Sequence, residues 1–227
     1  MDKNGVLALV GGSEWTEGCS FDATLLAASG GTDVLVLPTA AAYQNPERVV
    51  LRAAEWFATL GGQVEGLMVL DRASANDPGL ANVIRGARFI YLSGGSSLHL
   101  RSVLKLSAAF EALTEAWAGG AVLAGSAAGA MVLTDPMVDP RGGALTLGLG
   151  LVKQFVVIPQ FGDEHEDSHG QKVQRTVAMA PAGLPVVGVP ERTALLRDAE
   201  GGWHSEGARA PVVFVDGALT EGLTALK

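Results

Sequence analysis

The segment Val122–Met131, Val-Leu-Ala-Gly-Ser-Ala-Ala-Gly-Ala-Met, contains the residue types that most directly suggest chemistry. An apolar run enters a cluster of small residues, and an apolar stretch of helical character follows. Small residues are required where a strand turns so sharply into a helix that a larger flanking side chain would clash. The apex residue of such a turn projects into a site, and the next amide can stabilise a developing oxyanion. The apex here is Ala127, which carries no nucleophilic atom, and the next amide belongs to Ala128.

Neighbouring residues offer weaker candidates for the same chemistry. Ser126 could act as a displaced nucleophile, but adjacent side chains of a sharp turn diverge, so we expect it to pack or to hydrogen-bond to the backbone. Cys19 lies in the first connection rather than on the turn, and we expect a buried or half-buried thiol. Glu14 and Trp15 follow Gly11-Gly12 and are interpreted as pocket residues. Three further charged residues could line a cleft, although turn chemistry around the nearby prolines explains them equally well: Asp135, Asp139 and Arg141.

A short acidic loop places His165 and His169 four residues apart among four acidic residues. On a helix this spacing puts both imidazoles on one face, where they and a carboxylate could hold zinc or a similar ion. The alternative, which we prefer, is a solvated loop that begins a helix near 168–180 with acids at its N-terminus. We therefore expect no metal and no cofactor.

Short β-branched runs alternate along the chain with longer amphipathic stretches. The runs predict strands at 6–10, 33–37, 63–69, 88–92, 121–124, 155–158 and 186–189, and the longer stretches predict helices at 21–28, 46–60, 80–85, 97–104 and 108–118. Several strands are apolar on both faces, which is typical of parallel strands covered by helices on each side. From Thr193 to Leu226 the pattern predicts short antiparallel strands with glycine turns. The sequence thus predicts a single α/β domain over residues 1–227, with a doubly wound, mostly parallel sheet and helices on both faces.

Ligands of such sheets bind beyond the carboxyl ends of the strands. Glycines stand at three of these ends, at Gly11-Gly12, Gly94-Gly95 and Gly125. A single glycine after a strand is commonly just a turn residue. The recurrence of glycines at three strand ends favours a site at this edge of the sheet.

Four segments in order give the chain a specific resemblance. Gly125–Ala130 resembles the Gly-Thr/Ser-Ser-Ala-Gly-Ala turn of the dipeptidase E and cyanophycinase serine peptidases, which share the sheet of class I glutamine amidotransferases. Tyr91–Gly95 resembles that family's strand ending in Gly-Gly, and Leu147–Leu151 resembles the Gly-Leu-Gly-Leu before the strand that bears its histidine. Gly188–Leu195 resembles its Gly-Ile-Asp-Glu-x-Thr-Ala-Leu segment. The resemblance implies that the amides of Gly94, Gly95 and Ala128 form an oxyanion hole.

The departures from the family pattern bear on function. The resemblance places the serine nucleophile at Ala127, the histidine at Gln160 in Ile158-Pro159-Gln160-Phe161, and the orienting carboxylate at Glu191. A carboxamide does not accept a proton near pH 7, so even a nearby hydroxyl would remain unactivated. An engineered Ser→Ala change at 127 would predict an intact histidine, and Gln160 speaks against it.

We therefore expect a non-catalytic homologue that retains a cleft for a small-molecule or peptide ligand, by analogy an acidic peptide or amino acid. Two alternatives stay open. One is an active serine peptidase of acidic or β-aspartyl peptides whose residue 127 was altered, or which recruits Ser126 with His165 or His169. The other is a structural or assembly subunit with a vestigial cleft.

The composition limits the classes of partner that we expect. The 227 residues carry a net charge of −8, which disfavours binding to nucleic acid. No apolar run approaches the roughly 18 residues needed to span a bilayer, and no export signal is visible at Met1–Gly5, so we expect no membrane association. The single cysteine is typical of a reducing compartment, and we expect a cytoplasmic protein. A homodimer is implied by the resemblance alone.

Overall fold

A central seven-stranded sheet organises the protein in the computed structural model, which describes residues 4–162 and 167–226 apart from the side chains of 167–169. Its order is β11-β10-β1-β5-β4-β2-β3. The five strands from β1 to β3 in this order are mutually parallel, whereas β10 and β11 add an antiparallel edge. The strand bounds are β1 Leu7–Val10, β2 Asp33–Leu37, β3 Gln63–Gly66, β4 Phe89–Leu92, β5 Val122–Ser126, β10 Thr193–Arg197 and β11 Trp203–Gly207.

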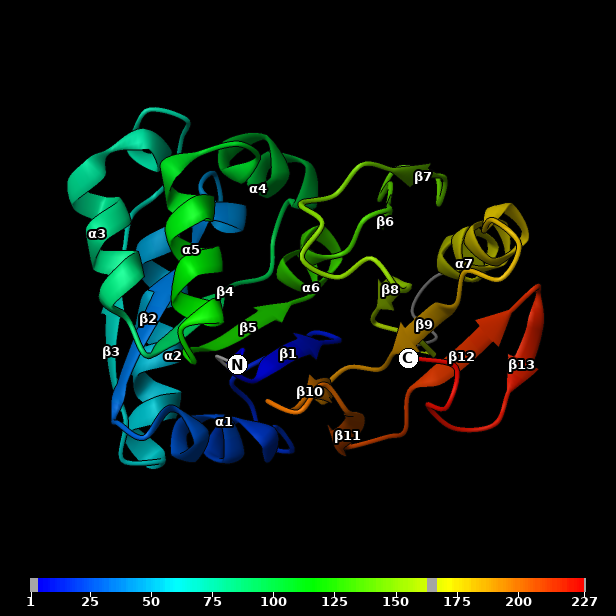
Figure 1. Ribbon diagram of the computed structural model, residues 1–227, viewed down its shortest axis with the longest axis horizontal. Helices are drawn as coiled ribbons and strands as arrows, with labels where there is room; N and C mark the ends of the chain where they lie inside the picture. Colours follow the sequence, from blue (N-terminus) through cyan, green and yellow to red (C-terminus); the bar gives the residue numbers. More distant parts are fainter. Residues whose placement is uncertain (1–3, 163–166, 227) are drawn as a thin grey trace.

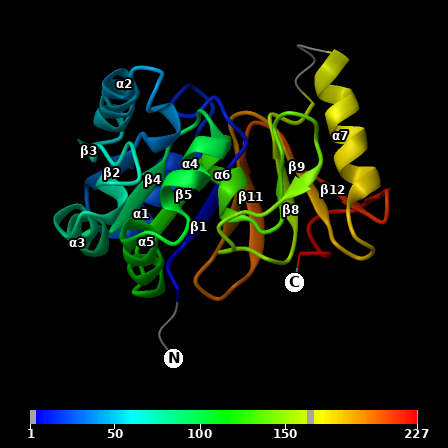
Figure 2. The ribbon, with the colours of Figure 1, turned by 90° about the horizontal axis from the view of Figure 1, so that it is seen from above.

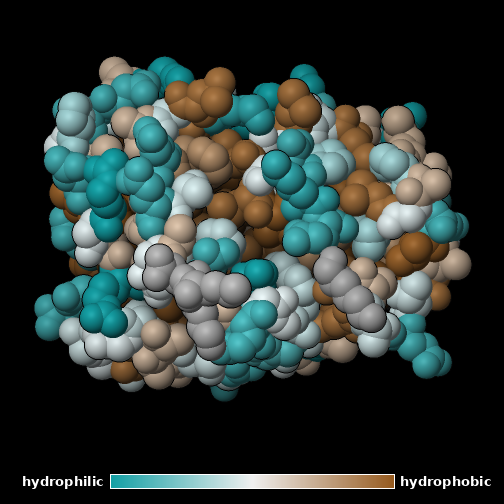
Figure 3. Space-filling model, in the orientation of Figure 1, coloured by the Kyte–Doolittle hydropathy of each residue, from teal (hydrophilic) through white to brown (hydrophobic). Residues whose placement is uncertain are grey.

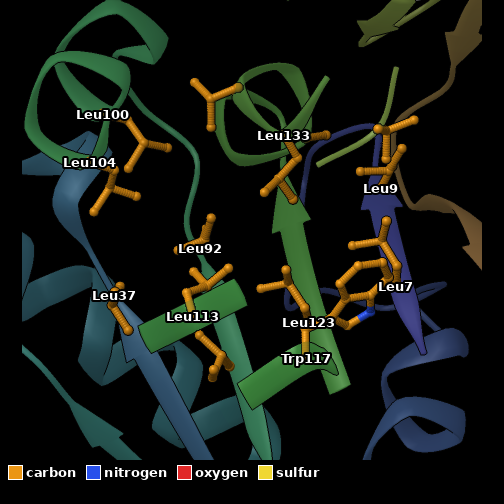
Figure 4. Packing of buried hydrophobic residues seen from close by; sticks show 14 of the residues in the cluster. Leu7, Leu9, Leu37, Leu92, Leu100, Leu104, Leu113, Trp117, Leu123 and Leu133 are labelled. Atoms are coloured by element: carbon orange, nitrogen blue, oxygen red, sulfur yellow. The ribbon is translucent and has the colours of Figure 1, made fainter. Parts of the chain in front are cut away.

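Alternating side chains of these strands build a separate core on each face of the sheet. Leu7, Leu9 and Leu123 point into the larger core, which is covered by α3 (Pro78–Gly86), α4 (Ser97–Leu104), α5 (Ala108–Ala118) and α6 (Ala128–Leu133). Figure 4 shows Leu113 and Trp117 of α5 against the leucines of the strands. The other face packs against α1 (Phe21–Ser29) and α2 (Pro46–Thr59). Figures 1 and 2 show helices on both faces, so the predicted doubly wound α/β fold is confirmed.

A second sheet of four strands stands beside the first, in the order β13-β12-β9-β8. It contains β8 (Val156–Pro159), β9 (Val186–Val189), β12 (Val212–Val215) and β13 (Ala218–Thr220). Among neighbouring strands, β8 and β9 pair in parallel, whereas β9 with β12 and β12 with β13 pair antiparallel. Figure 2 shows α7 (Asp167–Met179) packed on the outer side of this sheet. The sequence predicts β8 and β9 as strands but does not reveal that they leave the main sheet.

Helix starts follow the expected capping chemistry. The side chains of Asn45, Asp77, Ser96 and Ser107 each accept a hydrogen bond from a backbone N–H in the first turn of α2, α3, α4 and α5. Two of these helices also begin with proline, at Pro46 and Pro78, where the missing N–H costs nothing. The predicted boundaries of α4 and α5 are correct to the residue, and the caps Ser96 and Ser107 explain where these two helices begin.

Three smaller features complete the architecture. A two-stranded ribbon, β6 (Met137–Val138) with β7 (Leu145–Thr146), lies between α6 and β8. Short 3₁₀ turns occupy 39–41 and 74–76. The face seen in Figure 3 is hydrophilic over much of its area, with apolar residues gathered toward the middle. Within the part of the chain that the structure describes, no helix combines the length and apolar character needed to cross a membrane.

Candidate functional site

The turn between β5 and α6 has the strained geometry expected of a nucleophile elbow. Ala127 adopts φ 46° and ψ −101°, a conformation that residues with a side chain rarely occupy. The turn is tight because a Cβ on Gly125 would lie 2.6 Å from the carbonyl carbon of Gly129. In turn, a Cβ on Gly129 would lie 2.6 Å from the carbonyl oxygen of Leu92 on β4. The small residues at 125 and 129 are therefore a steric requirement of the elbow.

The three positions assigned by resemblance to the catalytic triad lie together at this elbow. A Cβ on Gly12 would be 3.2 Å from Cγ of Gln160 and 3.8 Å from Cβ of Ala127, so both side chains approach the same point above the loop after β1. The carboxamide Nε2 of Gln160 donates to Oε1 of Glu191 over 3.5 Å. The arrangement thus has the order apex residue, base position and carboxylate, with a methyl group and a carboxamide in the first two places.

The second sheet supplies two of these three residues, and the loop after β1 holds them in place. Gln160 follows β8 and donates its backbone N–H to the carbonyl oxygen of Gly11 at 2.8 Å. The backbone N–H of Arg192, next to Glu191 and after β9, donates to the carbonyl oxygen of Gly12 at 2.9 Å. These bonds explain how strands of a separate sheet deliver side chains to the carboxyl edge of the main sheet.

Glu14 forms a buried brace across the ends of β4 and β5. The residue is only 9% exposed. Its Oε1 accepts from the N–H of Gly94 at 3.2 Å, and its Oε2 accepts from the hydroxyl of Ser126 at 2.7 Å. Ser126 is fully buried, as expected of a packed residue, and its hydroxyl donates to the Glu14 side chain, whereas the sequence suggested the backbone as its partner. With its only proton committed and no access to solvent, Ser126 is not placed as a displaced nucleophile.

The brace changes which amides are available as oxyanion donors. Gly94 N–H, one of the three donors expected from the resemblance, is taken by Glu14. For the other two, Gly95 and Ala128, the described residues provide no hydrogen-bond acceptor. Because α6 has only six residues, its dipole adds little, and the two N–H groups themselves would have to hold an acceptor.

A pocket of about 400 Å³ opens over the elbow. Its walls include Gly12, Glu14, Gly94, Gly95, Ala127 and Gln160, together with Gln44, Val49 and Arg52 from the α2 region. The prediction that Glu14 is a pocket residue is confirmed. Sequence reasoning identified neither Gln44, in the loop before α2, nor Arg52, because polar residues on an amphipathic helix such as α2 ordinarily form its solvated face.

A layer of buried polar groups lies behind this pocket. Trp15 is 5% exposed and its ring centroid is 5.1 Å from that of Tyr91, so it packs beneath the pocket, not along its wall. Cys19 is buried, as predicted, and burial raises the pKa of its thiol. Burial also raises the pKa of Asp22 to about 8, an effect only partly offset by the indole N–H of Trp56 that donates to its Oδ2 at 2.9 Å. We therefore expect Asp22 to be neutral at pH 7.

The remaining candidates lie away from the elbow or outside the described residues. Asp135 accepts from the N–H of Gly148 and so supports a loop. Asp139 pairs with Arg141 at 2.6 Å, and the hydrogen bonds from that guanidinium lower the pKa of Asp139 to about 2. Asp139 does line a smaller hollow of about 190 Å³ that shares Gln160 with the main pocket.

The histidine and metal hypotheses rest on the acidic loop. His165, and the side chain of His169, lie outside the residues that the structure describes, as do the carboxylates expected around them. Elsewhere in the chain, the ring of His99 on α4 contacts the carbonyl oxygen of Leu70. Neither His99 nor His204 lines the pocket. Among the side chains that the structure describes, no group of three or more His, Cys, Asp or Glu residues is placed to hold a metal ion.

Chemically, Ala127 and Gln160 place a methyl group and a carboxamide at the two positions that the family resemblance assigns to the serine and the histidine. A methyl group cannot attack a carbonyl carbon, and the Gln160 carboxamide cannot take up the proton that such an attack releases. The amides of Gly95 and Ala128 remain able to hold a carbonyl or carboxylate oxygen.

Comparison with known proteins agrees with this architecture. Cyanophycinase of Synechococcus elongatus is 26% identical over 225 residues, covering 94% of this chain and 68% of the relative. Cyanophycinase of Nostoc sp. is 24% identical, with 94% and 74% covered. A peptidase from an acI-B1 Actinobacterium superposes with a TM-score of 0.83 at 26% identity, covering 96% of this chain and 94% of that one.

A second solved structure supports the fold alone. A putative Peptidase E protein from Listeria monocytogenes gives a TM-score of 0.64 at 17% identity, with 93% of this chain and 98% of that one covered. The profile of Peptidase family S51 matches residues 7–202, which is most of the chain. This chain belongs to Peptidase family S51.

Proposed function

We propose that this protein is a non-catalytic member of its family that binds a small molecule or peptide in the pocket over the elbow. The observation that carries the proposal is the pairing of Ala127 with Gln160. Their side chains approach each other above Gly12, where a serine and its histidine would have to meet. Loss of either group from a serine triad lowers turnover by on the order of 10⁶.

Retention of the rest of the site supports a binding role. The elbow keeps its strained φ, Glu191 keeps its contact to residue 160, and the Gly95 and Ala128 amides face no internal acceptor among the described residues. Binding and chemistry depend on different groups, so a preformed polar pocket can keep its ligand after the reacting groups are lost. By analogy with the family, aspartyl dipeptides and free amino acids are the first ligands to test.

The test combines calorimetric titration with a product assay on the same samples. The wild-type protein is titrated with the dipeptide Asp-Leu, its β-aspartyl isomer and free aspartate, and released leucine is measured by mass spectrometry. We expect saturable binding of at least one compound and no leucine above a buffer blank. Steady leucine release would contradict the non-catalytic assignment, and absence of any binding would instead favour a structural or assembly role.

A further inference from the structure

The pocket over the elbow is lined by two charged side chains of opposite sign, Glu14 and Arg52. They differ in how far the protein itself uses them. Both carboxylate oxygens of Glu14 already accept hydrogen bonds, from Gly94 N–H and from the Ser126 hydroxyl, and the residue is buried. Its charge therefore serves the internal brace and is not directed at a ligand.

Arg52 is held in position, but none of the described carboxylates pairs with its charge. The residue is exposed on α2. Its Nη2 donates to the backbone carbonyl of Glu14 at 3.3 Å, and its guanidinium carbon lies 5.9 Å from the centroid of the Trp15 ring. These two contacts fix the side chain against the pocket wall. A guanidinium has five N–H donors, and the described residues give Arg52 only this one acceptor and no carboxylate.

A fixed guanidinium with free donors is the preferred protein group for a planar carboxylate, which it binds with two parallel hydrogen bonds. The brace carboxylate of Glu14 in the same pocket disfavours a doubly charged anion such as phosphate, because like charges repel. Gln44 and Gln160 add neutral amides to the same lining. Arg52 is thus placed to bind one carboxylate of a ligand, with the neutral carboxamides of Gln44 and Gln160 in the same lining.

We propose that Arg52 is the specificity-determining residue of this site and that it binds a carboxylate of the ligand. The inference rests on the proposed binding function and names the residue that selects the ligand. In this arrangement Arg52 of α2 binds the carboxylate of the ligand, and the backbone N–H groups of Gly95 and Ala128 bind its carbonyl oxygen.

The experiment compares Arg52→Gln and Arg52→Lys with Arg48→Gln. Arg48 is an exposed arginine on the same helix that does not line the pocket, so it controls for loss of one surface charge. Each protein is titrated with Asp-Leu, Asn-Leu, Asp-Leu amide and inorganic phosphate, and its melting temperature verifies folding. Asp-Leu carries two carboxylates, and each of the other two peptides lacks one of them.

We expect the wild type to lose about 10- to 100-fold in affinity when the recognised carboxylate is removed, a range typical of a charged hydrogen-bonded pair. Arg52→Gln should bind Asp-Leu that much more weakly and no longer discriminate between the peptides. The affinity of Arg52→Lys for Asp-Leu should be intermediate, because lysine keeps the charge but lacks the two parallel N–H donors of a guanidinium. The affinity of Arg48→Gln should stay within about twofold of the wild type.

The outcomes separate the two proposals. Equal binding of Asp-Leu by the wild type and a folded Arg52→Gln variant overturns the role of Arg52 and leaves the binding function standing. Phosphate binding tighter than any peptide overturns the carboxylate assignment. Failure of every probe to bind the wild type contradicts both proposals, whereas leucine release by the wild type contradicts the non-catalytic function alone.

Discussion

At the scale of single residues, Glu14 braces the site beside Ala127 and Gln160, the residues at the positions assigned by resemblance to the nucleophile and the histidine. Glu14 joins the loop after β1 to Gly94 at the end of β4 and to Ser126 at the end of β5. Its side chain thereby fixes the relative position of three strand ends and consumes one of the expected oxyanion donors. From the sequence, Glu14 could be predicted as a pocket residue, but its partners could not, since they are 80 and 112 positions away.

Asp22 provides a test of the buried polar layer behind the pocket. In the unfolded chain its carboxyl ionises near pH 4, whereas burial in the folded protein raises its pKa to about 8. The folded state therefore holds one more proton between these values. The stability associated with the neutral carboxyl is present at low pH and is lost as the pH rises toward 8.

Asp22→Asn removes this linkage while retaining an oxygen for the Trp56 indole. Between pH 5 and pH 7 we expect the unfolding free energy of the wild type to fall, relative to the variant, by up to about 1.4 kcal/mol per pH unit. Urea titrations at several pH values measure the unfolding free energy of both proteins. Parallel pH profiles for the two proteins would show that Asp22 is ionised in the folded state.

At the scale of elements, the elbow depends on backbone-to-backbone contact between β5 and α6. Gly125→Ala would bring a methyl group within 2.6 Å of the Gly129 backbone. We expect it to destabilise the fold by roughly 1–3 kcal/mol, as overpacking of a closed core does. Gly86→Ala is the matched control, since it lies at the end of α3 with nothing within 4 Å of the added carbon, and it should be neutral or slightly stabilising. Chemical denaturation measures both, and a neutral Gly125→Ala would refute the steric account.

Elements were predictable where local chemistry decides them. The starts of α4 and α5 follow from capping serines, and β2 and β9 follow from short runs rich in valine and leucine. The predicted strand at 63–69 is too long, because β3 ends at Gly66 while Leu67 and Val69 are buried in the core beyond it. Because these core residues are apolar, they continue the sequence pattern of the strand although the strand itself has ended. The assignment of β8 and β9 to a second sheet depends on β12, a partner their own sequence does not specify.

At the scale of the whole molecule, the site exists only because the two sheets meet at the loop after β1. The main sheet supplies Ala127 and the amides, the second sheet supplies Gln160 and Glu191, and two backbone bonds to Gly11 and Gly12 join them. The positions of the triad residues could be proposed from the family resemblance. The place of Arg52 in the pocket lining could not be predicted from the sequence, because only the folded arrangement brings α2 to the pocket.

The most direct test of the central claim restores the missing groups one at a time. Leucine release from Asp-Leu is measured for Ala127→Ser, Gln160→His and the double variant, each verified for folding. If natural loss of both groups explains the site, the single variants should remain at the buffer rate and the double variant should exceed it by several orders of magnitude. Vigorous turnover by Ala127→Ser alone would mean that a base other than residue 160 serves the elbow, and would contradict the account.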